Sequence, residues 1–250
     1  MITWSERVHQ WSHLPVDDVG YPHASDLLAM SDTELIELVN QMRATRYGGW
    51  RNHGGLWREV LGLDSTTDKD ILDFGCGIGI EALEFALVGN RVSLADLSSV
   101  NVQLAERVLG LFGCSPVSIF HVSDKFPYFA GLSDSFDIFY CNGVLHHIPW
   151  ARSVMEVAHN VIREDGEARL MTYSDTGWRR ATNTDPPEDV TSHPQFEKFV
   201  RHFDQVGDYA DWYNEAKLKD WFGDLFDVTR CEYITPEKIY LASILVRRSV

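Results

Sequence analysis

The sequence predicts an α/β fold built on a doubly wound (Rossmann-like), mostly parallel sheet of seven strands that closes with an antiparallel hairpin at its C-terminal end. From residue 70 onward, short apolar runs alternate with amphipathic helical runs. This alternation is typical of parallel sheets covered by helices on both faces. The last two strand-like runs, 226–234 and 239–248, are separated by only four residues, Thr-Pro-Glu-Lys. A connection that short requires antiparallel pairing.

The central part of the chain supplies the five preceding strands in order. Helical patterns follow the first, second and fourth of them, and the last of these helices spans about 150–162. The apolar runs are too short for buried helices, and their β-branched and aromatic content favours strands. The five predicted strands are 71–74, 91–96, 117–122, 136–141 and 167–173.

Two further segments lie outside this alternating pattern. Residues 1–67 predict a helical N-terminal extension, in which Ser31 and Glu34 have the spacing of a capping box before an amphipathic helix. A Gly-rich run at 46–55 follows and predicts a loop or a broken helix start. Residues 175–215 predict a helical lid, because this aromatic insertion is too long for an ordinary loop. No linker separates two cores, so we expect 1–250 to form a single domain.

Composition and charge restrict the expected partners. The net charge of −15 argues against a nucleic-acid surface, which is usually basic. No apolar run approaches the roughly 20 residues that span a bilayer, and the N-terminus lacks a secretory signal pattern. The four cysteines are scattered without a CxxC pair, which favours a reduced, cytoplasmic protein without structural zinc. We expect neither a nucleic acid nor a membrane as partner, and the sequence does not indicate the oligomeric state.

The strongest functional signal lies at the junction of the first strand and its helix. The run DFGCGIG contains Asp73, Gly75, Cys76, Gly77 and Gly79. Glycines at this junction let the backbone turn sharply and let a ligand approach closely. The following helix start offers unpaired backbone amides. Doubly wound sheets bind their ligands in the crevice outside the carboxyl ends of the strands, so we expect a ligand here.

Polar positions follow the next three strands in the same way. Asp96 ends the second strand, about 20 residues beyond the glycine run, where an acidic side chain can bind ribose hydroxyls. Asp124 follows the third strand, and Asn142 and Gly143 end the fourth. Because the carboxyl ends of parallel strands share one edge of the sheet, we expect these residues around a single crevice.

With these motifs the sequence resembles the class I S-adenosylmethionine-dependent methyltransferases. The matching pieces are DFGCGIG (73–79), SLADLS (93–98), HVSD (121–124), FDIFYCNGVLHHI (136–148) and the reversed terminal hairpin. The resemblance covers residues 68–174 and 216–248. It implies an enzyme that binds S-adenosylmethionine, transfers its methyl group to a small organic acceptor and releases S-adenosylhomocysteine.

The resemblance also implies roles for single residues. The glycines would lie against the methionyl and ribosyl parts of the cofactor, and Asp96 would hold the ribose hydroxyls. Asp124 would lie near the adenine, and Asp73 and Asn142 near the methionyl end. The predicted cofactor site comprises Asp73, Gly75, Cys76, Gly77, Gly79, Asp96, Leu97, Asp124, Asn142 and Gly143.

Other functions fit parts of the same pattern. Residues 77–82 also match the loose GxGxxA pattern of dinucleotide-binding folds, and Asp96 would serve a nicotinamide cofactor equally well. An NAD(P)-dependent oxidoreductase and a non-catalytic S-adenosylmethionine-binding module are therefore alternatives, as is a protein methyltransferase. Asp73, Asp124 and the reversed hairpin favour the methyltransferase.

Catalytic residues are less predictable than the cofactor site. Methyl transfer from a sulfonium is an in-line displacement that depends mainly on alignment, and a base is needed only if the acceptor keeps its proton. His147 and His146 follow the fourth strand and are the candidate bases. Tyr173, at the end of the fifth strand, is a candidate for orienting the acceptor. All three rings could instead serve packing alone.

Three further groups of residues have weaker signals. Tyr47, Trp50, Arg51 and His53 in the Gly-rich run could contact the cofactor or the acceptor. The insertion offers a possible acceptor wall of aromatic residues, with Arg179 and Arg180 before it. His9 and His13 have metal-ligand spacing on a helix, but no third ligand is evident, so we expect no metal. The aromatic residues of the insertion are Phe196, Phe199, Phe203, Tyr209, Trp212 and Tyr213.

Overall fold

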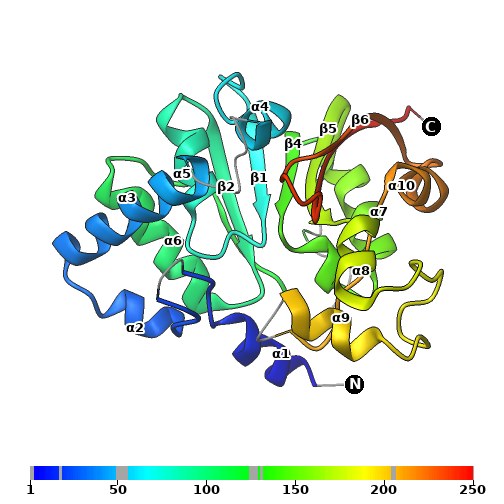
Figure 1. The fold of residues 1–250 in the computed structure, drawn as a ribbon. Helices are drawn as coiled ribbons and strands as arrows, with labels where there is room; N and C mark the ends of the chain where they lie inside the picture. Colours follow the sequence, from blue (N-terminus) through cyan, green and yellow to red (C-terminus); the bar gives the residue numbers. More distant parts are fainter. Residues whose placement is uncertain are drawn as a thin grey trace.

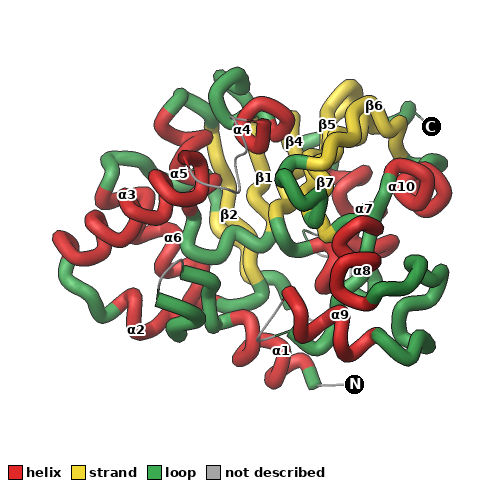
Figure 2. Tube along the Cα trace, in the orientation of Figure 1, coloured by secondary structure: helices red, strands yellow, loops and turns green. Residues whose placement is uncertain are grey.

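A seven-stranded sheet forms the centre of the molecule (Figures 1 and 2). The computed structural model describes residues 3–16, 19–48, 56–123, 129, 132–203 and 207–249. The order of the strands across the sheet is β3-β2-β1-β4-β5-β7-β6. The strands are β1 (Asp70–Phe74), β2 (Arg91–Asp96), β3 (Ile119–His121), β4 (Phe136–Asn142), β5 (Ile162–Tyr173), β6 (Phe226–Tyr233) and β7 (Tyr240–Arg247).

Strand direction follows the prediction. β1 pairs in parallel with β2 and β4, β2 with β3, and β4 with β5. Strand β7 runs antiparallel to both of its neighbours, β5 and β6. The predicted mostly parallel sheet with a C-terminal antiparallel hairpin is therefore confirmed.

Helices cover both faces of the sheet (Figure 2). Helices α5 and α6 pack on one face at β2, with α3 beside them, and α7 and α10 pack on the other face. Neighbouring residues of one strand face opposite cores, as the pleat requires: Ile71 belongs to the first core and Leu72 to the second. The helices are α1 (Trp4–Trp11), α2 (Ala24–Leu28), α3 (Asp32–Gly48), α4 (Leu56–Leu61), α5 (Ile80–Leu87), α6 (Ser99–Leu111), the short 3-10 helix η2 (Leu145–His147), α7 (Ala151–Val161), α8 (Asp175–Thr182), α9 (Phe196–Phe203) and α10 (Glu215–Phe222).

The structure departs from the predicted boundaries at three places. Strand β3 covers only 119–121, whereas β5 begins five residues earlier than predicted, at Ile162. The early part of β5 pairs with β4 across a register shift near Phe136, beside Asp165 with a positive φ of 64°. Helix α3 continues to Gly48, three residues into the run that predicted a loop or helix break. Strand and helix ends depend on such local irregularities, which periodicity does not encode.

The insertion is only partly helical. Ser174 caps α8 by accepting a hydrogen bond from the Gly177 amide, and α8 ends at Asn183 in the left-handed conformation. Helix α9 follows after an irregular stretch, and the chain returns along 207–214 without helix. The predicted capping box at Ser31 and Glu34 is present, with reciprocal hydrogen bonds of 2.8 and 3.3 Å. None of the described helices is long and apolar enough to cross a membrane.

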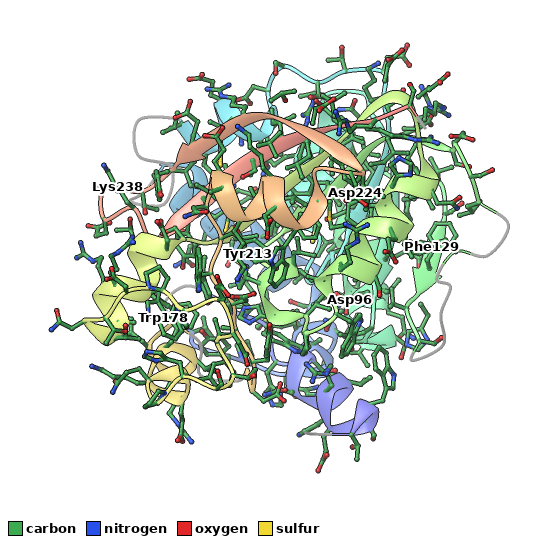
Figure 3. The ribbon with its side chains drawn as sticks, turned by 90° about the vertical axis from the view of Figure 1, so that its right-hand side faces the viewer. Asp96, Phe129, Trp178, Tyr213, Asp224 and Lys238 are labelled. Atoms are coloured by element: carbon green, nitrogen blue, oxygen red, sulfur yellow. The ribbon has the colours of Figure 1, made fainter. Side chains whose placement is uncertain are left out.

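The carboxyl ends of the parallel strands point toward α1 and α9, which lie across the lower end of the sheet in Figure 1. The N-terminal extension and the insertion therefore meet the edge of the sheet where the motif residues lie. In Figure 3, Asp96 lies in the lower part of the molecule, just above α1.

Candidate active site

A cavity of about 260 Å³ opens at the carboxyl ends of β1, β2 and β4. Its wall combines the glycine loop, the ends of these strands, η2 and one side of α1. The cavity extends past Tyr173 to the insertion, where Phe203 contributes. Because one continuous space joins the glycine loop to the histidines, a molecule bound at one end lies next to a molecule at the other.

The glycine loop is shaped for close approach by a ligand. Gly75, Gly77 and Gly79 all have positive φ values, of 79°, 51° and 83°, which disfavour other residues. The amide of Gly75 donates to the Ala95 carbonyl (2.7 Å), which ties the loop to β2. A Cβ at Gly75 would overlap Val144, whereas one at Gly77 would lie in ordinary contact, 3.5 Å from Leu14 Cδ2. The loop therefore exposes backbone to the cavity.

Asp96 is buried at the end of β2 and faces the same cavity. Its Oδ2 accepts a hydrogen bond from the Gly77 amide (3.0 Å), and its Oδ1 accepts from the Ser98 amide (2.9 Å) and the Asn101 side chain (3.1 Å). Burial raises the pKa of Asp96 to about 6, although these hydrogen bonds lower it in part. Because the Asp96 carboxylate lines the cavity, it lies where a ligand hydroxyl can donate to it.

Asn142 and Glu81 form a second polar group on the wall. Asn142 Nδ2 donates to Glu81 Oε1 (2.9 Å), and both residues line the cavity. Within the described part of the chain, the buried Asn142 Oδ1 has no hydrogen-bond partner. Buried polar atoms are rarely unsatisfied, so this oxygen is suited to a donor group of a bound molecule.

His147 is held in one tautomer by the insertion. Its Nδ1 lies 2.9 Å from the carbonyl oxygen of Tyr209. A carbonyl can only accept, so Nδ1 is protonated and Nε2 is the basic nitrogen of the neutral ring. The His147 ring also packs 4.6 Å from the Trp11 ring.

His146 is more deeply buried than His147. It is 1% exposed, its Nδ1 has no partner among the described residues, and burial holds its pKa well below the usual value. Its ring centroid lies 3.9 Å from that of Tyr173 at a tilt of 40°, and the Tyr173 hydroxyl lies 3.4 Å from the Phe203 carbonyl. His146 is therefore a neutral packing partner of Tyr173.

A buried ion pair anchors the segment that contacts His147. Lys217 Nζ lies 2.7 Å from Asp211 Oδ1, and the two side chains are 6% and 3% exposed. The Asp211 amide donates to the His146 carbonyl (2.8 Å). The Lys217 ammonium also lies 4.3 Å from the Trp212 ring centroid and 4.4 Å from that of Trp221. The segment that holds His147 is thus fixed to both η2 and α10.

Sequence reasoning missed the contribution of α1. Trp4, Arg7 and Trp11 recur at helical spacing and line the cavity, followed by Leu14. A capping box at Thr3 and Glu6 marks the start of this helix, so the signal was present in the sequence. What the sequence does not reveal is the surface that α1 covers. Asn101 holds α1 beside β2 by donating to the Trp11 carbonyl (2.9 Å).

The structure brings most of the predicted site residues together. Asp73 and Gly79 do not line the cavity. Asp73 is buried near the end of β1, and Gly79 packs on Ala105 of α6. Asp124 is outside the described residues. The predicted residues that line the cavity are Gly75, Cys76, Gly77, Asp96, Leu97, Asn142, Gly143, His146, His147 and Tyr173.

The residues with weaker sequence signals also differ in whether they reach the cavity. Trp50, Arg51, His53 and the side chain of Tyr47 lie outside the described part of the chain. Of the aromatic residues of the insertion, Phe203 reaches the cavity, whereas Phe199 and Trp212 pack in a core of the insertion itself. Trp178, which is labelled in Figure 3, belongs to the same core. Tyr213 belongs to the core beneath α10.

The remaining polar candidates have other partners or face solvent. Arg179 pairs with Asp175 and Asp185, and Arg180 is exposed. The rings of His9 and His13 contact each other at 5.2 Å. No group of three or more His, Cys, Asp or Glu side chains among the described residues is arranged to hold a metal ion.

Comparison with known proteins agrees with the fold and the motif. A family model described as "Methyltransferase domain" matches residues 47–240. The ubiquinone biosynthesis O-methyltransferase of Salmonella paratyphi A is 26% identical over 156 residues, which cover 61% of this chain and 62% of that protein. The chain thus spans about three fifths of the length of this curated relative.

Two solved structures share the fold. A protein from Pyrococcus horikoshii superimposes with a TM-score of 0.61 at 12% identity, over 84% of this chain and 93% of that one. An S-adenosylmethionine-dependent methyltransferase from Aquifex aeolicus superimposes with a TM-score of 0.56 at 11% identity, over 88% of this chain and 100% of that one. The chain therefore belongs to the methyltransferase domain family and has the fold of a solved S-adenosylmethionine-dependent methyltransferase.

Proposed function

We propose that this protein transfers the methyl group of S-adenosylmethionine to a hydroxyl oxygen of a small organic acceptor. The observation that supports this most strongly is the single cavity that joins the glycine loop and Asp96 to His147 and Tyr173. The curated relative named above is an O-methyltransferase, which favours an oxygen acceptor. A concave cavity beneath α1, lined mostly by apolar and aromatic side chains, favours a small molecule over a protein as acceptor.

The residues at one end of the cavity fit the cofactor. The Asp96 carboxylate can accept from ribose hydroxyls, and the backbone at Gly75 and Gly77 leaves room for the methionyl chain. Asn142 Oδ1, which has no partner among the described residues, can accept from the methionyl ammonium together with Glu81. Cys76, Leu97 and Gly143 line the same end. When bound, the cofactor supplies a methyl group made electrophilic by its sulfonium.

At the other end, His147 acts as general base. Its Nδ1 is committed to the Tyr209 carbonyl, so Nε2 takes the proton of the acceptor hydroxyl as the oxygen attacks. Loss of the proton makes the oxygen a stronger nucleophile. Tyr173 and Phe203 form the aromatic wall against which the acceptor packs, while the neutral His146 packs against the Tyr173 ring.

We also propose that the protein acts in the cytoplasm. Cys76, Cys114, Cys141 and Cys231 are all free thiols, and disulfides persist in secreted proteins but are rare in cytosolic ones.

Calorimetric titration tests the cofactor half of this proposal. The protein should bind S-adenosylhomocysteine with micromolar affinity, and Asp96→Ala should weaken that binding by at least tenfold, because hydrogen bonds to a charged group are worth about 1.5–3 kcal/mol. Arg180→Ala is the matched control, since this side chain is exposed and remote from the cavity. Binding of NAD without binding of S-adenosylhomocysteine would refute the proposal.

Methyl transfer from labelled S-adenosylmethionine to catechol and to para-hydroxybenzoate tests the catalytic half. His147→Gln should lower kcat by about 10²–10⁴-fold, the usual contribution of a general base, while binding of S-adenosylhomocysteine stays within a factor of three of the parent. His146→Gln should mainly reduce stability. An unchanged kcat in His147→Gln would exclude this residue as the base.

A further inference from the structure

Arg7 is the one arginine or lysine among the described residues that line the cavity. It projects from the middle of α1, and only 6% of the residue is exposed. Buried arginines are almost always paired. The partners of this guanidinium therefore indicate whether it serves structure alone.

The contacts of Arg7 leave its hydrogen-bonding capacity largely unused. Its Nη1 lies 3.4 Å from Asp208 Oδ1, and its guanidinium lies 5.3 Å from the Trp150 ring centroid. Within the described residues its guanidinium makes no hydrogen bond, and Asp208 Oδ1 likewise has no hydrogen-bond partner. A guanidinium offers five N–H donors in a planar fork that matches a carboxylate. Arg7 thus offers the cavity guanidinium N–H groups that make no hydrogen bond with the described residues.

The neighbours of Arg7 place it at the acceptor end. Trp11, one helical turn further along α1, packs on the proposed base His147. Asp208 directly precedes Tyr209, whose carbonyl orients the same histidine. Leu14, which lies near Gly77, comes after the end of α1 and is seven residues away from Arg7. Arg7 therefore contacts the segment whose next residue orients the proposed base.

From this arrangement we propose that Arg7 binds a carboxylate of the acceptor, so that the preferred substrates are aromatic hydroxy acids. The inference rests on the proposed function and deepens it. A protein of net charge −15 repels anions in general, so an anionic acceptor needs a local cation inside the cavity. Trp11, Tyr173 and Phe203 supply flat apolar surface for a ring, and Arg7 fixes which end of that ring faces away from His147.

The test compares two probes that differ in charge but hardly in shape. Binding of para-hydroxybenzoate and para-hydroxybenzamide to protein saturated with S-adenosylhomocysteine is measured by calorimetry. The parent should prefer the acid, and Arg7→Gln should weaken binding of the acid by roughly 10- to 100-fold while changing that of the amide less than threefold. Arg180→Gln, which removes an exposed arginine, should change neither.

Asp208→Asn separates a binding role from a structural one. If Arg7 binds the acceptor, removing the competing negative charge should tighten binding of the acid by about 2- to 5-fold. If Arg7 only pins α1 to the insertion, Asp208→Asn and Arg7→Gln should weaken binding of both probes alike, and the proposal fails.

Binding of S-adenosylhomocysteine itself distinguishes the source of the carboxylate and separates the two proposals. A loss of this affinity in Arg7→Gln would assign the arginine to the cofactor carboxylate and overturn the assignment to the acceptor. Failure of the parent to bind S-adenosylhomocysteine would refute the proposed function. Normal cofactor binding with no preference for the acid refutes only the role of Arg7.

Discussion

Replacing Lys217 by methionine should destabilise the protein far more than replacing its neighbour Lys219. The Lys217 ammonium lies 2.7 and 2.9 Å from the two carboxylate oxygens of Asp211, and both side chains are almost fully buried. Methionine has a similar length and suits the ring contacts of this site. The substitution therefore removes the charge while changing the packed volume little.

The expected magnitude follows from the burial of the pair. Burial raises the pKa of Asp211 and lowers that of Lys217, so each charge depends on the other to stay ionised. Removing one partner of a buried pair costs about 3–5 kcal/mol, because the remaining charge is left uncompensated. For a chain of 250 residues each kcal/mol corresponds to about 2–4 °C in Tm. We expect Tm to fall by roughly 6–20 °C.

Thermal and urea unfolding followed by circular dichroism measure this effect. Lys219→Met is the matched control on the same helix, because its pair with Glu215 is more than half exposed and contributes about 0.3–0.5 kcal/mol. The double variant Lys217→Met/Asp211→Asn removes both charges and should recover at least half of the lost stability. A single-variant cost below about 1 kcal/mol, or no recovery in the double variant, would show that ring packing and not charge pairing stabilises this site.

Two further perturbations address the cofactor end of the site. Because burial raises the pKa of Asp96 to about 6 and a ribose hydroxyl donates to the ionised form, affinity for S-adenosylhomocysteine should fall as the pH drops below 6, approaching tenfold per unit. Titrations between pH 5 and 8 check this, and Asp96→Asn should abolish the dependence. The raised pKa also means that ionising Asp96 costs folding free energy as the pH rises from 3.8 to about 6, so Asp96→Asn should be no less stable than the parent at neutral pH. Gly79→Ala places a Cβ on a residue with positive φ and only 2.9 Å from Ala105 Cβ. Gly89→Ala also places a Cβ on a residue with positive φ, but no atom lies within 4 Å of it. Urea unfolding should show about 1–2 kcal/mol lost in Gly89→Ala and clearly more in Gly79→Ala; equal losses would contradict the close packing of α5 on α6.

The sheet was predictable because the sequence patterns that specify its strands and connections are local. Apolar runs of strand length, separated by helical patterns, specify a doubly wound sheet, and the four-residue connection at 235–238 specifies the reversed hairpin. The glycine loop and Asp96 were predictable for a related reason. Each lies at the carboxyl end of a parallel strand, and the topology brings all such ends to one edge. Boundaries were less accurate where a register shift or an added helical turn extends an element, as at Ile162 and Gly48.

The sequence by itself determined the fold class, the glycine loop and the presence of histidines beside it. Only the tertiary structure decided which side chains complete the site. Arg7 and Asp208 meet from nearly opposite ends of the chain, and most of the insertion's aromatic residues turn into its own core instead of the cavity. Periodicity shows which face of a helix is apolar, but not which surface that face covers. That choice depends on long-range packing and on burying each charge beside a partner, which only the assembled fold provides.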